Sequence, residues 1–163
     1  MPITRWLAKA VALSAGLACL ACSRPQEATQ AYTPGLGEIM ALNQMRHSKL
    51  WFAGQAGNWD LAAYELDELQ EGLDDAAKYH PTHKSSPLPV PALIQKIMSQ
   101  PMQELRTAIR GKDGARFAVA FDALTAGCNS CHQATNFGFN VVVRPSANPF
   151  PNQSFTAPKP PGT

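Results

Sequence analysis

Cysteine is scarce in this sequence, and no pair is left over for a structural disulfide. Of the four cysteines among 163 residues, Cys19 and Cys22 lie at the end of an apolar N-terminal run, and Cys128 and Cys131 share one short motif. A fold held together by disulfides is therefore not expected, even in an oxidising compartment. We expect the cysteines to serve covalent attachment instead.

A membrane-spanning hydrophobic run is lacking at the N-terminus. The apolar run of residues 10–20 is too short, since a helix needs about 20 apolar residues to cross a bilayer. It follows Arg5 and Lys9 and ends in small residues, which predicts a secretory signal peptide over residues 1–22. Residues 17–23, LACLACS, resemble the lipobox of bacterial lipoproteins, in which a cysteine becomes the lipidated first residue of the mature chain. We predict a protein of the Gram-negative periplasm, lipid-anchored at Cys22, with ordinary cleavage to a soluble protein as the alternative.

An excess of charge of one sign is also lacking. Without the predicted signal peptide, which contains Arg5 and Lys9, 12 basic and 12 acidic side chains remain. A chain so close to neutral has no general attraction to nucleic acid, so nucleic-acid binding is not expected. The polar residues 23–35 have little to bury and are predicted to form a flexible tether before the folded domain.

A strand pattern is missing from residues 36–130, where apolar residues recur at helical spacing. The spacing predicts helices over about 36–56, 59–79 and 91–110, and a fourth that runs to about 134. Asn58 is expected to cap the second helix and Asp113 the fourth. Pro101 removes one backbone donor within the third helix, so a kink near Ser99 or a break is expected there. Four amphipathic helices with mostly short connections predict an all-α fold, an antiparallel four-helix bundle over residues 36–134.

The motif that carries the chemistry lies at the end of the fourth predicted helix. Cys128-Asn129-Ser130-Cys131-His132 has the form C-x-x-C-H, in which two thiols add to the vinyl groups of a haem and the adjacent histidine binds its iron. A thioredoxin-like redox pair would require an α/β fold, and a zinc site would require more ligands nearby. The sequence therefore predicts one covalent haem c, attached through Cys128 and Cys131 with His132 as proximal iron ligand.

The place of this motif, on the last helix of a predicted bundle, resembles that in the class II c-type cytochromes, the cytochrome c prime group. The resemblance covers residues 36–134 and implies a haem held between helices near one end of a four-helix bundle. Members of this class often dimerise through helices 1 and 2, so the resemblance also suggests a homodimer. The chain departs from the class after the motif, because it continues from Gln133 to Thr163 where class II chains usually end.

The extension of residues 135–163 is predicted to be irregular, with a disordered end. Its aromatic residues are expected to fold over the haem edge or to close the end of the bundle, because aromatic burial is strongly stabilising; these residues are Phe137, Phe139, Phe150 and Phe155.

Two residues of the first predicted helix are candidates for the sixth iron ligand. Met40 and His47 share one face of that helix, two turns apart. Low-spin class II cytochromes use a methionine of helix 1, which favours Met40, with His47 as the alternative. Ordinary core packing is the competing role for Met40. For His47 the competing roles are a hydrogen bond to a carbonyl or to a haem propionate.

These features predict a one-electron carrier that passes electrons between redox partner proteins of the periplasm, not an enzyme. The alternative is a five-coordinate haem protein that binds or senses small gases, and a haem peroxidase is the third candidate. The peroxidase is the least favoured, because the sequence shows neither a distal arginine and histidine pair at recognisable spacing nor a second haem motif. The acidic side chains of residues 60–75 and the basic ones of residues 106–116 predict docking surfaces for the redox partners.

Overall fold

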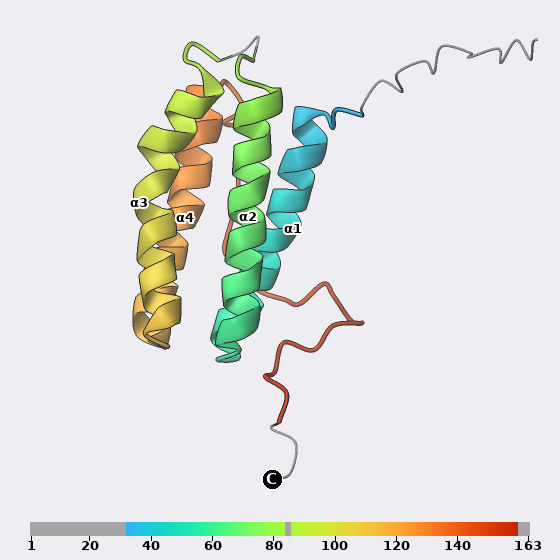
Figure 1. The fold of residues 1–163 in the computed structure, drawn as a ribbon, viewed down its shortest axis with the longest axis vertical. Helices are drawn as coiled ribbons and strands as arrows, with labels where there is room; N and C mark the ends of the chain where they lie inside the picture. The colour runs from blue at the N-terminus through green and yellow to red at the C-terminus, as the bar shows by residue number, and fades with distance from the viewer. Residues whose placement is uncertain (1–31, 84–85, 160–163) are drawn as a thin grey trace, which may run out of the picture. The chain divides into compact units, whose positions relative to one another are not determined.

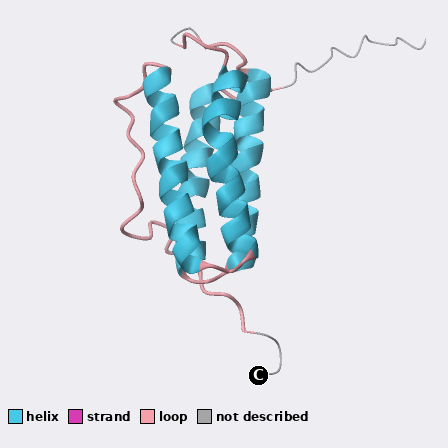
Figure 2. Ribbon diagram, turned by 90° about the vertical axis from the view of Figure 1, so that its left-hand side faces the viewer, coloured by secondary structure: helices cyan, strands magenta, loops and turns pink. Residues whose placement is uncertain are grey.

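Four α-helices dominate the described part of the chain, residues 32–83 and 86–159 of a computed structural model. They are α1 (Leu36–Gln55), α2 (Trp59–Tyr79), α3 (Val90–Arg110) and α4 (Gly114–Ala134). The helices lie side by side and successive ones run in opposite directions (Figures 1 and 2), and the described residues contain no strand. The prediction of an all-helical fold is confirmed.

Some predictions fall on parts of the chain outside the described residues. These are the signal peptide over residues 1–22 with the lipid anchor at Cys22, residues 23–31 of the tether, and most of the last six residues, which were predicted to be disordered. The compact unit that contains the helices begins at Thr33.

Two helices begin at the predicted caps. The side chain of Asn58 accepts a hydrogen bond from the backbone N–H of Leu61 at the start of α2, at 3.3 Å. Asp113 accepts one from the backbone N–H of Arg116 at the start of α4, at 3.0 Å. Each satisfies one of the backbone donors that a helix N-terminus leaves without an intrahelical partner.

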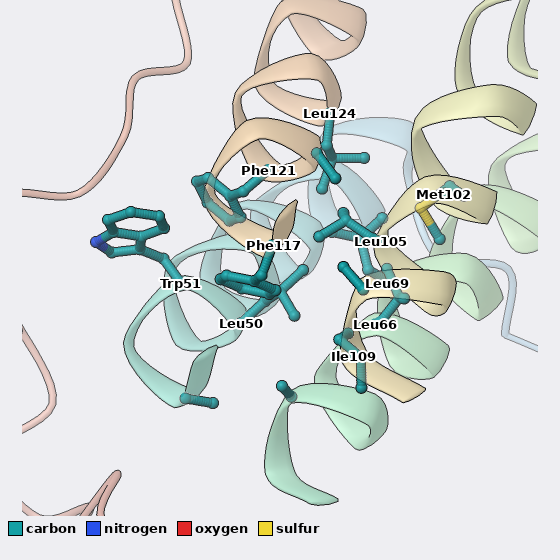
Figure 3. Close-up of a cluster of buried hydrophobic side chains, with 14 of the residues drawn as sticks. Leu50, Trp51, Leu66, Leu69, Met102, Leu105, Ile109, Phe117, Phe121 and Leu124 are labelled. Carbon is teal, nitrogen blue, oxygen red and sulfur yellow. The ribbon is translucent and has the colours of Figure 1, made fainter. Parts of the chain in front are cut away.

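Most of the core lies toward the end of the bundle where α1 and α3 end and α2 and α4 begin. It is built mainly from aromatic and branched side chains. Phe117, Phe121 and Leu124 of α4 are fully buried and face the leucines of the other helices, as Figure 3 shows. Trp51 of α1 packs against Phe121 with ring centroids 4.9 Å apart. The same face of α4 continues to Cys128, which packs against this core, so the core fixes the rotation of α4 about its axis.

Of the two outcomes expected at Pro101, a kink or a break, the break does not occur, since α3 continues as one helix from Val90 to Arg110. A proline within a helix removes one backbone hydrogen bond. The buried face of α3, with Met98, Met102 and Leu105 each at most 3% exposed, outweighs that loss by packing on both sides of the proline.

The C-terminal extension turns back along the bundle and has neither helix nor strand within its described residues, 135–159. Arg144 reaches Asp122 of α4 and lies over the ring of Trp51 of α1, with its guanidinium carbon 4.4 Å from the ring centroid. Further along, Phe155 is 8% exposed and packs on Phe52 of α1. The extension therefore covers the side of the bundle between α1 and α4.

The aromatic residues of the extension do not share one role. Phe137 packs near the end of the bundle, and Phe150 and Phe155 pack against α1. Phe139 does not close the end of the bundle, because this side chain is 81% exposed. Phe139 and its neighbours Val141 and Val143 point outward, while the backbone between them bonds to α4.

Candidate functional site

A cavity of about 340 Å³ lies at the end of the bundle where α1 begins and α4 ends. Its volume falls in the range of small-molecule and cofactor pockets, and its walls are mostly apolar. All four helices and the extension contribute to it. All five residues that the sequence singles out line this one cavity: Met40, His47, Cys128, Cys131 and His132.

Cys128 and Cys131 are free thiols in the last two turns of α4. Burial raises the pKa of the Cys128 thiol to about 12, with a smaller contribution from neighbouring Cys131, and burial also raises the pKa of Cys131. Redox-active C-x-x-C pairs need the opposite, a lowered thiol pKa, which a helix N-terminus favours. Their place near the C-terminus of a helix argues against a thioredoxin-like pair.

His132 has one ring nitrogen engaged by the backbone of the extension. Its Nδ1 lies 2.5 Å from the carbonyl oxygen of Asn140, and a carbonyl only accepts, so Nδ1 carries the hydrogen. In the neutral ring, Nε2 is then the atom with the free lone pair. This is the arrangement that prepares a histidine for metal ligation, because the bond at one nitrogen fixes the tautomer and the ring orientation.

His47 is buried, 3% exposed, and lies opposite Thr125 of α4. The Thr125 hydroxyl donates its single hydrogen to the carbonyl of Phe121 at 2.9 Å, so it accepts from His47 Nε2 at 2.8 Å. The ring of His47 also packs on that of Phe121, with centroids 4.4 Å apart. Burial lowers the pKa of His47 from 6.5 to about 4, so the ring is neutral at physiological pH.

The bond between His47 and Thr125 sets the register between α1 and α4, which run in opposite directions. Met40 lies seven residues before His47, and His132 lies seven residues after Thr125. With a rise of about 1.5 Å per residue, both steps cover about 10 Å toward the same end of the bundle. Met40 is therefore level with His132 along the bundle, whereas His47 lies about 10 Å deeper.

One buried polar atom of the cavity wall has no hydrogen-bond partner among the described residues. Asn43 is 7% exposed, its Oδ1 accepts a hydrogen bond from Arg46 at 3.3 Å, and its Nδ2 is left without a partner. A Cβ on Gly72 would lie 2.0 Å from Asn43 Oδ1, so close packing of α2 holds the amide in place. An unpaired buried donor costs about 1–3 kcal/mol, which an acceptor within the cavity would recover.

Cys128, Cys131 and His132 do not converge on one point. The described residues contain no group of three or more His, Cys, Asp or Glu side chains that could hold a metal ion. These three side chains are spread over the wall of an apolar cavity. Such a spacing suits a flat group that the thiols would hold at its edge and the imidazole at its centre. The donor set, the apolar walls and the unpaired amide of Asn43 fit a haem.

Comparisons of the chain with protein-family models, with curated proteins and with solved structures find no match. Among the described helices, none is long and apolar enough to cross a membrane.

Several residues of the site were missed by the sequence analysis. Asn43 and His83 line the cavity, and the ring of His83 packs edge-on against Phe137 with centroids 5.3 Å apart. Asn140 contributes a backbone carbonyl, which no side-chain pattern could reveal. The position of Asn43 three residues after Met40 on the same helix was the one available signal.

Proposed function

We propose that this chain is a monohaem c-type cytochrome of the periplasm that carries single electrons between redox partner proteins. Cys128 and Cys131 would hold the haem through thioether bonds, and His132 Nε2 would bind its iron. The haem supplies the one-electron chemistry between its ferric and ferrous states. The protein supplies the axial ligands, excludes water through the apolar cavity and fixes the geometry.

The proposal is supported by two observations: Met40 and His132 line the same cavity, and the bond between His47 and Thr125 puts them at the same level of the bundle. If His132 holds the iron, a second ligand from α1 would have to lie near the level of His132, and the register between α1 and α4 favours Met40 for this role. His47 lies deeper and uses Nε2 to bond Thr125, so ligation through that nitrogen would break a buried hydrogen bond. We therefore propose Met40 as the sixth ligand and a structural role for His47.

Two protein ligands favour a carrier over a gas-binding protein or an enzyme. If both His132 and Met40 hold the iron, they would leave no place for a substrate or a gas to bind it, while the haem could still exchange electrons with partner proteins. Methionine with histidine also raises the reduction potential relative to two histidines. The same arrangement supports a divergent class II cytochrome, an antiparallel bundle with its haem motif at the end of α4.

The proposal about redox partners rests on the charged surfaces. Part of the acidic side of α2 is neutralised within the protein, because Glu68 pairs with Arg46 at 3.0 Å and Asp67 pairs with Arg106 at 2.5 Å. Other carboxylates of α2, such as Asp60 and Glu71, are exposed. If they dock a basic partner, the rate of electron transfer falls as ionic strength rises, because salt screens exposed charges.

The decisive experiment is expression of the full chain with the machinery that attaches haem c, followed by absorption spectra of both oxidation states. Covalent haem that remains on the denatured polypeptide, and that is lost in the Cys128→Ser/Cys131→Ser double variant, is expected. Polypeptide without covalent haem would refute the proposal. Rapid binding of carbon monoxide by the ferrous wild-type protein would show instead the five-coordinate gas binder.

The sixth ligand is tested by Met40→Leu against Met45→Leu as a matched control. Met45 is on the same helix, is half-buried and does not line the cavity. Met40→Leu is expected to lose the sulfur-to-iron band at the red end of the ferric spectrum and to bind carbon monoxide when reduced. Met45→Leu should retain the wild-type spectrum. A band that survives in Met40→Leu would show that another residue is the ligand.

A further inference from the structure

The segment that follows α4 returns along that helix and bonds to it next to the proposed haem ligand. The return begins at Asn136, whose φ of 64° is in the left-handed region that asparagine tolerates better than most residues. The N–H of Phe137 donates to the carbonyl of His132 at 2.7 Å, and the N–H of Asn136 donates to Gln133 at 3.2 Å. These two bonds form a Schellman motif, which ends the helix and reverses the chain.

After this reversal, residues 140–144 run antiparallel to α4 and bond to it at three successive points. His132 donates to the carbonyl of Asn140, Asn129 bonds the backbone of Val142, and Asp122 pairs with Arg144. The positions on α4 decrease as those on the extension increase. We call residues 137–144 the proximal strap.

The middle contact is made by Asn129, the residue directly after Cys128 in the haem motif. Its Nδ2 donates to the carbonyl of Val142 at 2.8 Å, and its Oδ1 accepts from the N–H of the same residue at 2.8 Å. Only a side-chain amide offers a donor and an acceptor side by side. The pair therefore holds Val142 as a neighbouring strand would, and glutamine would displace it by one methylene.

This contact determines where the carbonyl of Asn140 lies. Asn129 and His132 are three residues apart, so they are neighbours on one face of α4. Val142 is two residues after Asn140, and extended chain covers about 7 Å over two residue steps. With Val142 fixed on Asn129, the chain has little freedom left to move the Asn140 carbonyl away from His132 Nδ1. The short Schellman turn fixes the other end of the strap.

We propose that Asn129 is a positioning residue for the iron-binding imidazole, acting through the proximal strap. The inference rests on the proposed function, since it concerns how His132 binds iron. The strap keeps the hydrogen on Nδ1 and directs Nε2 into the cavity. An imidazole that donates a hydrogen bond from Nδ1 is a more basic ligand, and it favours the ferric state relative to an imidazole without that bond. One of the two variable residues of C-x-x-C-H, Asn129, would thus take part in setting the reduction potential.

The test compares Asn129→Ala with the wild-type holoprotein and with Ser130→Ala as control. Ser130 is the exposed neighbour of Asn129, and its hydroxyl donates only within α4, to the carbonyl of Ala126 at 2.9 Å. Asn129→Ala is expected to raise the reduction potential and to change the electron paramagnetic resonance of the ferric iron. Ser130→Ala should change neither. Val142→Pro, which removes the N–H that bonds Asn129 Oδ1, should reproduce the effect of Asn129→Ala.

Amide hydrogen exchange at Val142 supplies a measurement that does not depend on haem. In Asn129→Ala this amide is expected to exchange at least about tenfold faster, because it loses its bonded partner. An unchanged exchange rate would overturn the strap contact itself. Equal potentials of Asn129→Ala and Ser130→Ala, both with full covalent haem, would overturn the positioning role. If wild-type protein carries no covalent haem, the proposed function fails, while the exchange at Val142 still tests the strap.

Discussion

Because His47 of α1 is buried, the free energy of unfolding is expected to decrease as pH falls from about 6.5 to about 4. Burial lowers the pKa of His47 from 6.5 to about 4. As pH falls through about 6.5, the unfolded chain takes up a proton at His47, whereas the folded protein does not until about pH 4. The unfolded state therefore binds more protons within this window, and the free energy of unfolding decreases with falling pH. Below about pH 4 the loss levels off.

The size of the effect follows from the shift. Each pKa unit corresponds to about 1.4 kcal/mol, so the full loss is about 3 kcal/mol, of which about 2 kcal/mol is reached between pH 7.5 and pH 5. The assay is urea unfolding of the holoprotein, followed by helical circular dichroism at both pH values. The comparison variant is His47→Gln, since glutamine can still donate to Thr125 but does not titrate.

Carboxylates titrate in both proteins, so the difference between their two losses isolates His47. Wild type is expected to lose about 2 kcal/mol more than His47→Gln. Equal losses would refute the assignment of His47 as a buried neutral base. A changed iron spectrum in His47→Gln would show that this residue binds the iron, and would overturn the argument from the register between α1 and α4.

Two further predictions concern stability. Gly54→Ala is expected to destabilise the fold by about 1–3 kcal/mol, because its Cβ would lie 2.2 Å from the fully buried ring of Phe117. The control Gly114→Ala, where nothing lies within 4 Å of the added Cβ, should not destabilise the fold. Equal midpoints of urea unfolding for the two variants would contradict the close packing at Gly54. Arg144→Ala removes an ion pair to α4 and the stacking over Trp51, with an expected loss of about 1 kcal/mol and a red shift of tryptophan fluorescence. Unshifted fluorescence would show that the extension does not cover this ring.

What the sequence determined by itself is local. The four helices, their caps at Asn58 and Asp113 and the placement of Cys128 and His132 near the end of a helix follow from spacing and capping chemistry within a few residues. The haem prediction also rests on five consecutive residues. A kink or a break was expected at Pro101, and the break does not occur because buried side chains on both sides of the proline hold α3 together.

The choice between Met40 and His47 was open in the sequence, because both lie on one face of the same helix. Only the packing of α1 against α4 sets a register, in which His47 meets Thr125 and Met40 lies level with His132. The proximal strap was equally hidden, since the carbonyl of Asn140 is a backbone group that any residue would supply. Helix periodicity predicts which residues share a face of one helix. Which residues of distant segments meet depends on how those faces pack against one another, and only the tertiary structure decided this packing.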